Sequence, residues 1–340
     1  MTVPARIHAI LAKQSDQAVI FRRGPSNKVA VIGWDRRDDT FTVGQWFYGR
    51  IYEYRCDISP DGRHILYFAA KYGRSNPMEE AMNKWVGEEI GEFDWSSNWS
   101  KYHDYLVKRK KIEKAMLKKH AKEILQIRNS PDYTDRSWTA ISRYPYLKAT
   151  DLWFNGTGWN GGGLFLDNKH VCLNRPPEEI AETVQHLDSH CFKEIKPPDY
   201  CKEWGWWGSE WGTAHGECPM NYVPRLERDG WTIVKMEGWG FVLDKPIAEG
   251  LVLRKEFIMD VKRREPGIGV YYEQHMVLEN GRQVVDGVNW RWADTDPSRK
   301  RLLFAMDGKL YSMNFSGLNE KAKCLHDFND MPFQRLAAPY

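Results

Sequence analysis

Short hydrophobic runs separated by turn-forming clusters recur along this chain and predict antiparallel β structure. Residues 59–62 read SPDG, in which Pro presets φ and Gly accepts a positive φ, and the apolar run at 65–68 predicts a buried strand. Asp-Gly at 307–308 and Asn-Gly at 280–281 each stand between two strand-like segments, a strong signal of a two-residue hairpin. We therefore expect most of the chain to form antiparallel sheets.

The turn and strand at 59–68 recur near the C-terminus. Asp294 falls against Asp57 and Pro297 against Pro60, and a degenerate third copy follows the glycines at 161–163. When two predicted insertions are removed, the copies are spaced by one or two steps of about 40 to 45 residues, the size of a four-stranded propeller blade. The spacing favours a repeated, blade-like architecture.

Two insertions interrupt the strand pattern. Residues 76–136 are mainly helical, because the apolar residues of KYHDYLVKRKKIEKAMLKKHAKEILQIRN gather on one side of a 3.6-residue period and the lysines on the other. Residues 175–228 contain a short helix signal and then a loop rich in Trp, Gly and Cys. We expect residues 1–340 to form a single β-propeller domain that carries both insertions.

The stretch SPDGRHILYF at 59–68 resembles the SPDGK-and-hydrophobic-run motif of TolB-like and WD-repeat-like β-propellers. The second copy has Ser298-Arg299 in place of Asp-Gly, and the C-terminal HDFNDMPFQRLAAPY is similar to bacterial proteins of this type. The resemblance implies an all-β-dominated fold, a β-propeller of about five blades, with a helical insertion and a Trp-rich loop insertion. It also implies a role in binding rather than chemistry.

Composition adds to this interpretation. The chain has 340 residues, 42% of them hydrophobic, and its 16 Trp, 16 Tyr and 14 Phe suit packed sheets. A formal charge of +3, from 49 basic and 46 acidic residues, creates no global field that favours nucleic acid or a membrane surface. The apolar patch at 7–11 is too short for a signal peptide, and no segment approaches the roughly 18 apolar residues of a membrane helix. With six scattered cysteines, these features predict a cytoplasmic protein.

Two features are candidates for binding a protein partner. Four tryptophans lie within eight residues of the second insertion, and such side chains anchor interfaces or stack on sugars and bases. The lysine face of the predicted helix would steer an acidic partner. The candidate partner-binding residues are Trp204, Trp206, Trp207, Trp211, Lys108, Lys111, Lys118 and Lys122. The alternatives are tryptophans packed against the propeller and a solvated lysine face, and the helix lacks the interleaved aromatics that would favour nucleic acid.

The second insertion also contains thiols and imidazoles, the ligands of structural zinc sites. They are His190, Cys191, Cys201, His215 and Cys218. Of these, only His215 and Cys218 have the close spacing of known zinc motifs. We therefore expect neither a metal nor a cofactor.

A carbohydrate-active propeller is the main alternative, because such enzymes use two carboxylates that face each other. Asp35, Asp57, Asp294 and Asp296 lie near predicted strand ends. Asp57 and Asp294, however, occupy the turn position of the repeat, where an Asx side chain commonly caps the local backbone. We assign no catalytic residue.

The sequence thus predicts a non-catalytic β-propeller scaffold that recognises a protein partner through its insertions. Carbohydrate binding or glycoside hydrolysis is the second hypothesis. A structural module that self-associates through its helical arm is the third.

Overall fold

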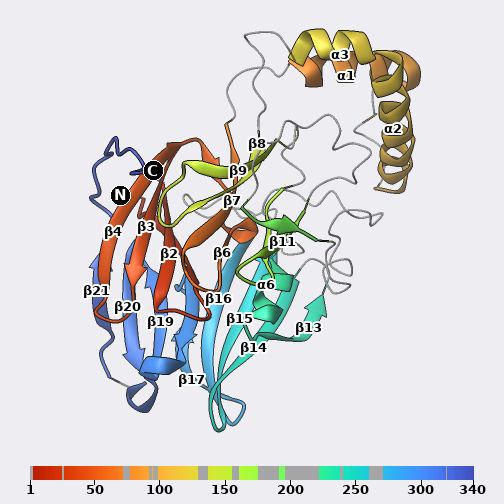
Figure 1. Cartoon of the computed structure of the whole chain (residues 1–340). Helices are drawn as coiled ribbons and strands as arrows, with labels where there is room; N and C mark the ends of the chain where they lie inside the picture. The colour runs from red at the N-terminus through yellow and green to blue at the C-terminus, as the bar shows by residue number, and fades with distance from the viewer. Residues whose placement is uncertain are drawn as a thin grey trace. The chain divides into compact units, whose positions relative to one another are not determined.

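The computed structural model describes most of the chain, with gaps. The described residues are 3–24, 27–71, 77–91, 94, 99–128, 137–154, 161–174, 191–195, 222–237, 240–259, 271–318 and 320–340. The chain separates into two compact units, Met1–Lys71 with Ser137–Tyr340 and Tyr72–Arg136. The described part of the first unit consists mainly of antiparallel sheets and that of the second of helices, as Figure 1 shows, so the predicted all-β-dominated fold is confirmed.

Sheets 1 and 2 come from the first half of the chain. Sheet 1 is an antiparallel meander of β1 (Arg6–Leu11), β2 (Gln17–Arg23), β3 (Lys28–Asp35) and β4 (Thr40–Tyr48). Sheet 2 runs in the order β5 (Arg50–Ile51), β7 (His64–Ala70), β8 (Ser137–Arg143) and β9 (Ala149–Phe154), with β6 (Asp57–Ile58) also paired to β7. The short 3-10 helix η1 (Glu53–Arg55) precedes β6.

Sheets 3, 4 and 5 follow in chain order. Sheet 3 contains β10 (Gly163–Phe165), β11 (His170–Leu173) and β12 (Lys193–Glu194), of which the last two are parallel. The helix α6 (Val223–Arg228) leads into sheet 4, which contains β13 (Thr232–Glu237), β14 (Gly240–Ala248), β15 (Leu251–Met259), β16 (Tyr271–Glu279) and β17 (Arg282–Gly287). Sheet 5 contains β18 (Trp292–Asp296), β19 (Arg301–Met306), β20 (Lys309–Asn314) and β21 (Lys323–Asp327), with η3 (Pro297–Arg299) and η4 (Phe315–Gly317) between strands.

The predicted two-residue hairpins form. Residues 307–308 join β19 to β20 with φ values of 51° and 74°, and residues 280–281 join β16 to β17 with φ values of 48° and 79°. Positive φ at both positions defines the type I′ turn, whose twist matches that of the flanking strands. The local chemistry of Asp-Gly and Asn-Gly is therefore enough to place these turns.

The predicted match between residues 57–66 and 294–303 is confirmed by strand register. Asp57 pairs with Leu66 between β6 and β7, and Asp294 pairs with Leu303 between β18 and β19. In sheet 1, Ile10 pairs with Val19 across the same separation of nine residues. The first hairpin of sheet 1 thus has the same register separation without a turn proline.

Buried side chains join neighbouring sheets. One cluster spans sheets 1 and 2, one spans 2 and 3, one spans 4 and 5, and one joins sheet 5 back to sheet 1. Representative members of these clusters are Val19 with Ile65, Leu66 with Phe165, Leu302 with Leu253, and Leu303 with Ile20. Burying each such side chain contributes about 1.5–3 kcal/mol, and strands covered on both faces need the continuous apolar runs seen in the sequence.

The helical unit contains α1 (Pro77–Ile90), α2 (Trp99–Lys119) and α3 (Ala121–Arg128). Its core is formed by Trp85 and Val86 of α1 with Met116 and Ile124. The single helix expected after residue 101 is divided at His120, whose ring stacks on Trp85 with centroids 4.0 Å apart. Among the described helices, none has the length and apolarity needed to cross a membrane.

Candidate functional site

The lysine face of the helical unit is the predicted site that the structure describes best. Lys108, Lys111 and Lys118 on α2 and Lys122 on α3 are all exposed, and none forms an ion pair with another described residue. Residues 99–128 contain ten Lys and Arg against three Asp and Glu, a formal charge of +7, whereas the whole chain carries +3. Positive charge is therefore concentrated on these two helices.

The apolar side of the same helices is covered within the unit. Ile112 and Leu117 of α2 are partly buried against the core formed with α1. Arg109 is held by Glu113 one turn further on, with Nε and Oε1 2.8 Å apart. The helical unit thus has its own small core, and its lysines are left to face solvent.

The other predicted site residues lie mainly outside the described residues. These are Trp204, Trp206, Trp207, Trp211, His190, Cys201, His215 and Cys218. Cys191 is described and exposed, and its backbone N–H donates to Asp151 Oδ1 at 2.8 Å. No group of three or more His, Cys, Asp or Glu side chains is arranged to hold a metal ion within the described part of the chain.

Asp57 has a different role from the local cap that the sequence predicted. Its side chain is fully buried, and Arg228 of α6 donates to both carboxylate oxygens at 2.5 and 2.9 Å. The backbone N–H of Phe165 in β10 donates to Oδ2 at 2.8 Å. The local-cap expectation was wrong for Asp57, because this carboxylate ties β6 to sheet 3 and to α6.

The remaining aspartates proposed for a glycosidase site are also engaged. Asp294 accepts from the backbone N–H of its neighbour Thr295 at 2.7 Å and from Lys245 Nζ at 2.6 Å, so it has one local backbone bond and one ion pair to sheet 4. Asp296 is fully buried between Arg36 and Arg301, and Asp35 is bound by Arg37. The Arg37 guanidinium holds the pKa of Asp35 well below its ordinary value. These carboxylates serve ion pairs that join turns and strands.

A buried ionic cluster in sheet 4 is a feature that the sequence analysis missed. Lys255 Nζ lies 3.0 Å from Glu273 Oε2 and donates to Tyr222 OH at 2.9 Å. His275 Nε2 lies 3.4 Å from the same Glu273 oxygen, and Trp290 O lies 3.1 Å from its Nδ1. We call Tyr222, Lys255, Glu273 and His275 the sheet-4 ionic cluster; each is about 1% exposed.

Burial and charge act in opposite directions within this cluster. Burial alone would raise the pKa of Glu273, but the Lys255 ammonium and His275 outweigh it and hold that pKa below its ordinary value. Burial lowers the pKa of His275, so its ring is neutral at pH 7. The cluster is thus one buried Lys–Glu ion pair with neutral partners, which joins β15, β16 and the residue before α6.

The sequence contains a signal that would have found this cluster. Buried positions in β15 alternate as Leu251, Leu253, Lys255 and Phe257, so the lysine is in phase with the apolar face. A charged residue in phase with buried residues must find a partner in the interior.

Helix α6 also contacts the first two sheets. Arg225 donates to His8 Nε2 in β1 at 3.0 Å and to Cys56 O before β6. Burial and the Arg225 charge lower the pKa of His8 well below its ordinary value, so His8 accepts as a neutral ring. Arg225 and Arg228 therefore connect this helix to sheets 1, 2 and 3.

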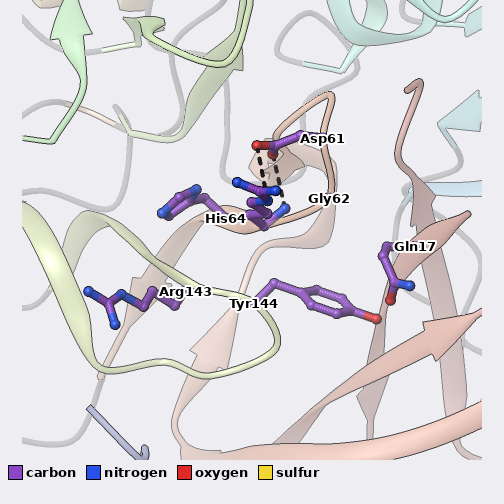
Figure 2. Close-up of a pocket in the computed structure, with 7 residues that line it drawn as sticks. Gln17, Asp61, Gly62, His64, Arg143 and Tyr144 are labelled. Atoms are coloured by element: carbon purple, nitrogen blue, oxygen red, sulfur yellow. Dashed lines mark hydrogen bonds and ion pairs between the residues drawn. The ribbon is translucent and has the colours of Figure 1, made fainter. Parts of the chain in front are cut away.

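A groove of about 540 Å³ lies between sheets 1 and 2 (Figure 2). It is lined by Gln17, Asp61, Gly62, Arg63, His64, Arg143 and Tyr144. His64 and Arg143 are paired residues of β7 and β8, and Figure 2 shows their side chains extending from one end of the group while Tyr144 points toward Gln17. The residues come from three separate segments, which is why sequence reasoning did not group them.

Comparisons with known proteins add little. No protein-family model and no curated protein matches the chain. Among solved structures, the crystal structure of the tricorn protease aligns with 8% sequence identity and a TM-score of 0.20. The alignment covers 94% of this chain and 22% of that one, so this chain spans about a fifth of that protein's length. A likeness at this level carries no argument about fold or function.

Proposed function

We propose that the sheet unit is a five-bladed β-propeller and that the protein is a non-catalytic scaffold that binds an acidic protein partner. The propeller is supported by the five sheets, each formed from strands that follow one another in the chain. It is also supported by the cluster that joins sheet 5 to sheet 1 through Leu303 and Ile20, as ring closure requires.

The turn between β1 and β2 gives further support, because it contacts turns of sheets 2, 3 and 5 and the end of α6. Lys13 contacts Arg228 O and lies 3.7 Å from Asp229, after α6. Gln14 receives a hydrogen bond from Asn168 of sheet 3, and its backbone N–H donates to Pro60 O of sheet 2. In the same turn, Asp16 accepts from Arg299 of sheet 5 at 2.7 Å. Turns of sheets 1, 2, 3 and 5 thus converge with the end of α6, which leads into sheet 4, as turns do at one face of a propeller.

The observation that carries the binding proposal is the charge of +7 on residues 99–128. Exposed lysines in such a patch steer an oppositely charged partner and speed its association, with an effect that falls as salt rises. The four tryptophans of residues 204–211 are the proposed anchors that would supply short-range affinity. The proposal that no catalysis occurs rests on the aspartates, which are engaged in structural ion pairs.

Fluorescence anisotropy of the full chain with labelled polyglutamate tests the lysine face. One variant changes four exposed lysines to Glu: Lys108, Lys111, Lys118 and Lys122. If each lysine forms an ion pair worth about 0.5 kcal/mol with the peptide, the variant should bind about 30-fold more weakly at low salt. The matched control changes four exposed lysines of the sheet unit to Glu and should have less than about a threefold effect. Those four lysines are Lys169, Lys193, Lys321 and Lys323.

Equal losses of polyglutamate affinity in the two variants would show a general effect of net charge. That result would refute the lysine face as the binding site. If a single-stranded DNA oligonucleotide binds more tightly than polyglutamate, the proposed partner would be a nucleic acid and not an acidic protein. Deleting residues 203–212 should weaken binding of a peptide with both acidic and aromatic residues more than binding of polyglutamate. A crystal structure in which the five sheets do not surround a common axis would refute the propeller.

A further inference from the structure

The groove between sheets 1 and 2 has three basic side chains with little else to bind. Among the described residues, nothing forms a hydrogen bond with the His64 imidazole or the Arg143 guanidinium. Arg63 Nε lies 3.8 Å from Asp61 Oδ2, beyond hydrogen-bond distance. The Arg143 guanidinium lies over the Tyr340 ring at 4.8 Å, a contact that uses its face and leaves its N–H edge available.

Several other polar atoms of the groove already have hydrogen-bond partners. Asp61 Oδ1 accepts from Ser59 Oγ at 2.6 Å and from the backbone N–H of Arg63 at 3.0 Å. Tyr144 OH donates to a backbone carbonyl of β2 at 3.1 Å, and the Gln17 amide donates to Asp35. The groups left over are the guanidinium groups of Arg63 and Arg143, which carry a permanent positive charge, the His64 imidazole, and Asp61 Oδ2, which lies 3.8 Å from Arg63 Nε and offsets part of that charge.

We propose that this groove binds the phosphate or carboxylate group of a small organic ligand. The planar fork of a guanidinium matches the two oxygens of such an oxyanion; Arg143 and Arg63 supply two forks, and His64 belongs to the same lining. The ring of Tyr144 offers an apolar surface for the rest of the ligand. The volume of about 540 Å³ is in the range of known ligand pockets.

Packing holds the groove open in one shape. A Cβ atom on Gly62, which has a φ of 75°, would lie 2.5 Å from Ser15 Oγ and 2.7 Å from Gln17 Cβ. The turn before His64 is thus pressed against the β1–β2 turn, and a larger residue at 62 has no room. A site that is formed in advance loses less free energy to ordering when the ligand binds.

Binding in the groove is linked to protonation of His64. Burial lowers the pKa of this imidazole; Asp61 and Asp151 oppose the shift, while Arg143 and Arg63 reinforce it. An oxyanion beside the ring raises the pKa again, because it stabilises the charged form. Affinity for an anion therefore increases as pH falls.

Isothermal titration calorimetry of the full chain at constant ionic strength tests the site. Inorganic phosphate and acetate are each titrated at pH 8 as probes of a phosphate and a carboxylate group. The anion with the lower dissociation constant identifies which of the two groups the site prefers. Sulfate has the same charge at pH 6 and pH 8, so any pH dependence of its binding comes from the protein. It should bind several-fold more tightly at pH 6 than at pH 8 in the wild type.

Arg143→Met should weaken the tighter probe about tenfold, and His64→Gln should abolish the pH dependence of sulfate binding. Lys323→Met removes an exposed charge from sheet 5 and should change affinity less than about twofold. If Arg143→Met alters the melting curve, Arg63→Met, at a side chain 81% exposed, replaces it. The proposal is overturned if no probe binds saturably, or if the groove variants lose no more affinity than Lys323→Met.

Discussion

Replacing Lys255 with Met removes the positive charge from the sheet-4 ionic cluster while keeping a side chain of similar length. Lys255 is about 1% exposed, and its Nζ lies 3.0 Å from Glu273 Oε2. The variant therefore leaves the Glu273 carboxylate buried without its ion-pair partner. Breaking a buried pair in this way costs about 3–5 kcal/mol. In a domain of this size that corresponds to a melting temperature lower by about 6–20 °C.

The sign of the pH dependence is also expected to change. In the wild type the pKa of Glu273 is held below its ordinary value, so its stabilising contribution is present above the unfolded pKa of about 4.3 and is lost as pH falls through the folded pKa. Without Lys255, burial is the largest remaining influence and the pKa of Glu273 rises. The folded variant then binds a proton more tightly than the unfolded chain, so its stability falls as pH rises above about 4.3.

Thermal melting of the wild type and of Lys255→Met at pH 5 and pH 8 measures both effects, and the deficit of the variant should be larger at pH 8. The control is Lys255→Met with Glu273→Gln, which removes both charges and should recover most of the loss. The reasoning is refuted if the single variant melts within about 2 °C of the wild type at pH 8, or if the double variant is no more stable than the single one.

Two further predictions concern turns and ion pairs. Gly281 and Gly308 have φ values of 79° and 74°, but an added Cβ meets nothing within 4 Å at the first and lies 2.1 Å from Asn329 Oδ1 at the second. In urea denaturation, Gly281→Ala should lower the free energy of unfolding by about 1 kcal/mol and Gly308→Ala by about 2–3 kcal/mol. Equal losses would contradict the steric contact between residue 308 and Asn329. Arg228→Met should lower the free energy of unfolding by about 3 kcal/mol, because Asp57 is fully buried; a loss below about 1 kcal/mol would contradict the role of this pair.

Local features of the sequence predicted the hairpins, the strand after residue 62 and the helices, because their causes lie within a few residues. An Asn-Gly or Asp-Gly pair requires a positive φ that few other residues tolerate. The match between residues 57–66 and 294–303 was also visible in the sequence, and Asp57 and Asp294 hold equivalent register positions. The division of the long helix at His120 was not visible, because it coincides with a stacking contact to Trp85 on another helix.

The candidate sites divide in the same way. The lysine face could be identified from the sequence, because the 3.6-residue period of a helix places the lysines on the side opposite the apolar residues. The groove could not, because Gln17, His64 and Arg143 come from three strands and meet only when sheets 1 and 2 pack together. All eight residues proposed for partner binding, the four lysines and the four tryptophans, stay a prediction.

The kinds of element in this protein, their turns and the concentration of charge on residues 99–128 can all be read from the sequence, since each depends on backbone preference or on spacing along the chain. Tertiary structure alone decided the partners of buried charge. Asp57 binds Arg228, 171 positions away in the chain, and Arg225 reaches His8 across 217. A buried charge is stable only beside an opposite charge or a hydrogen-bonding group, and which residue meets it is set by the packing of distant sheets.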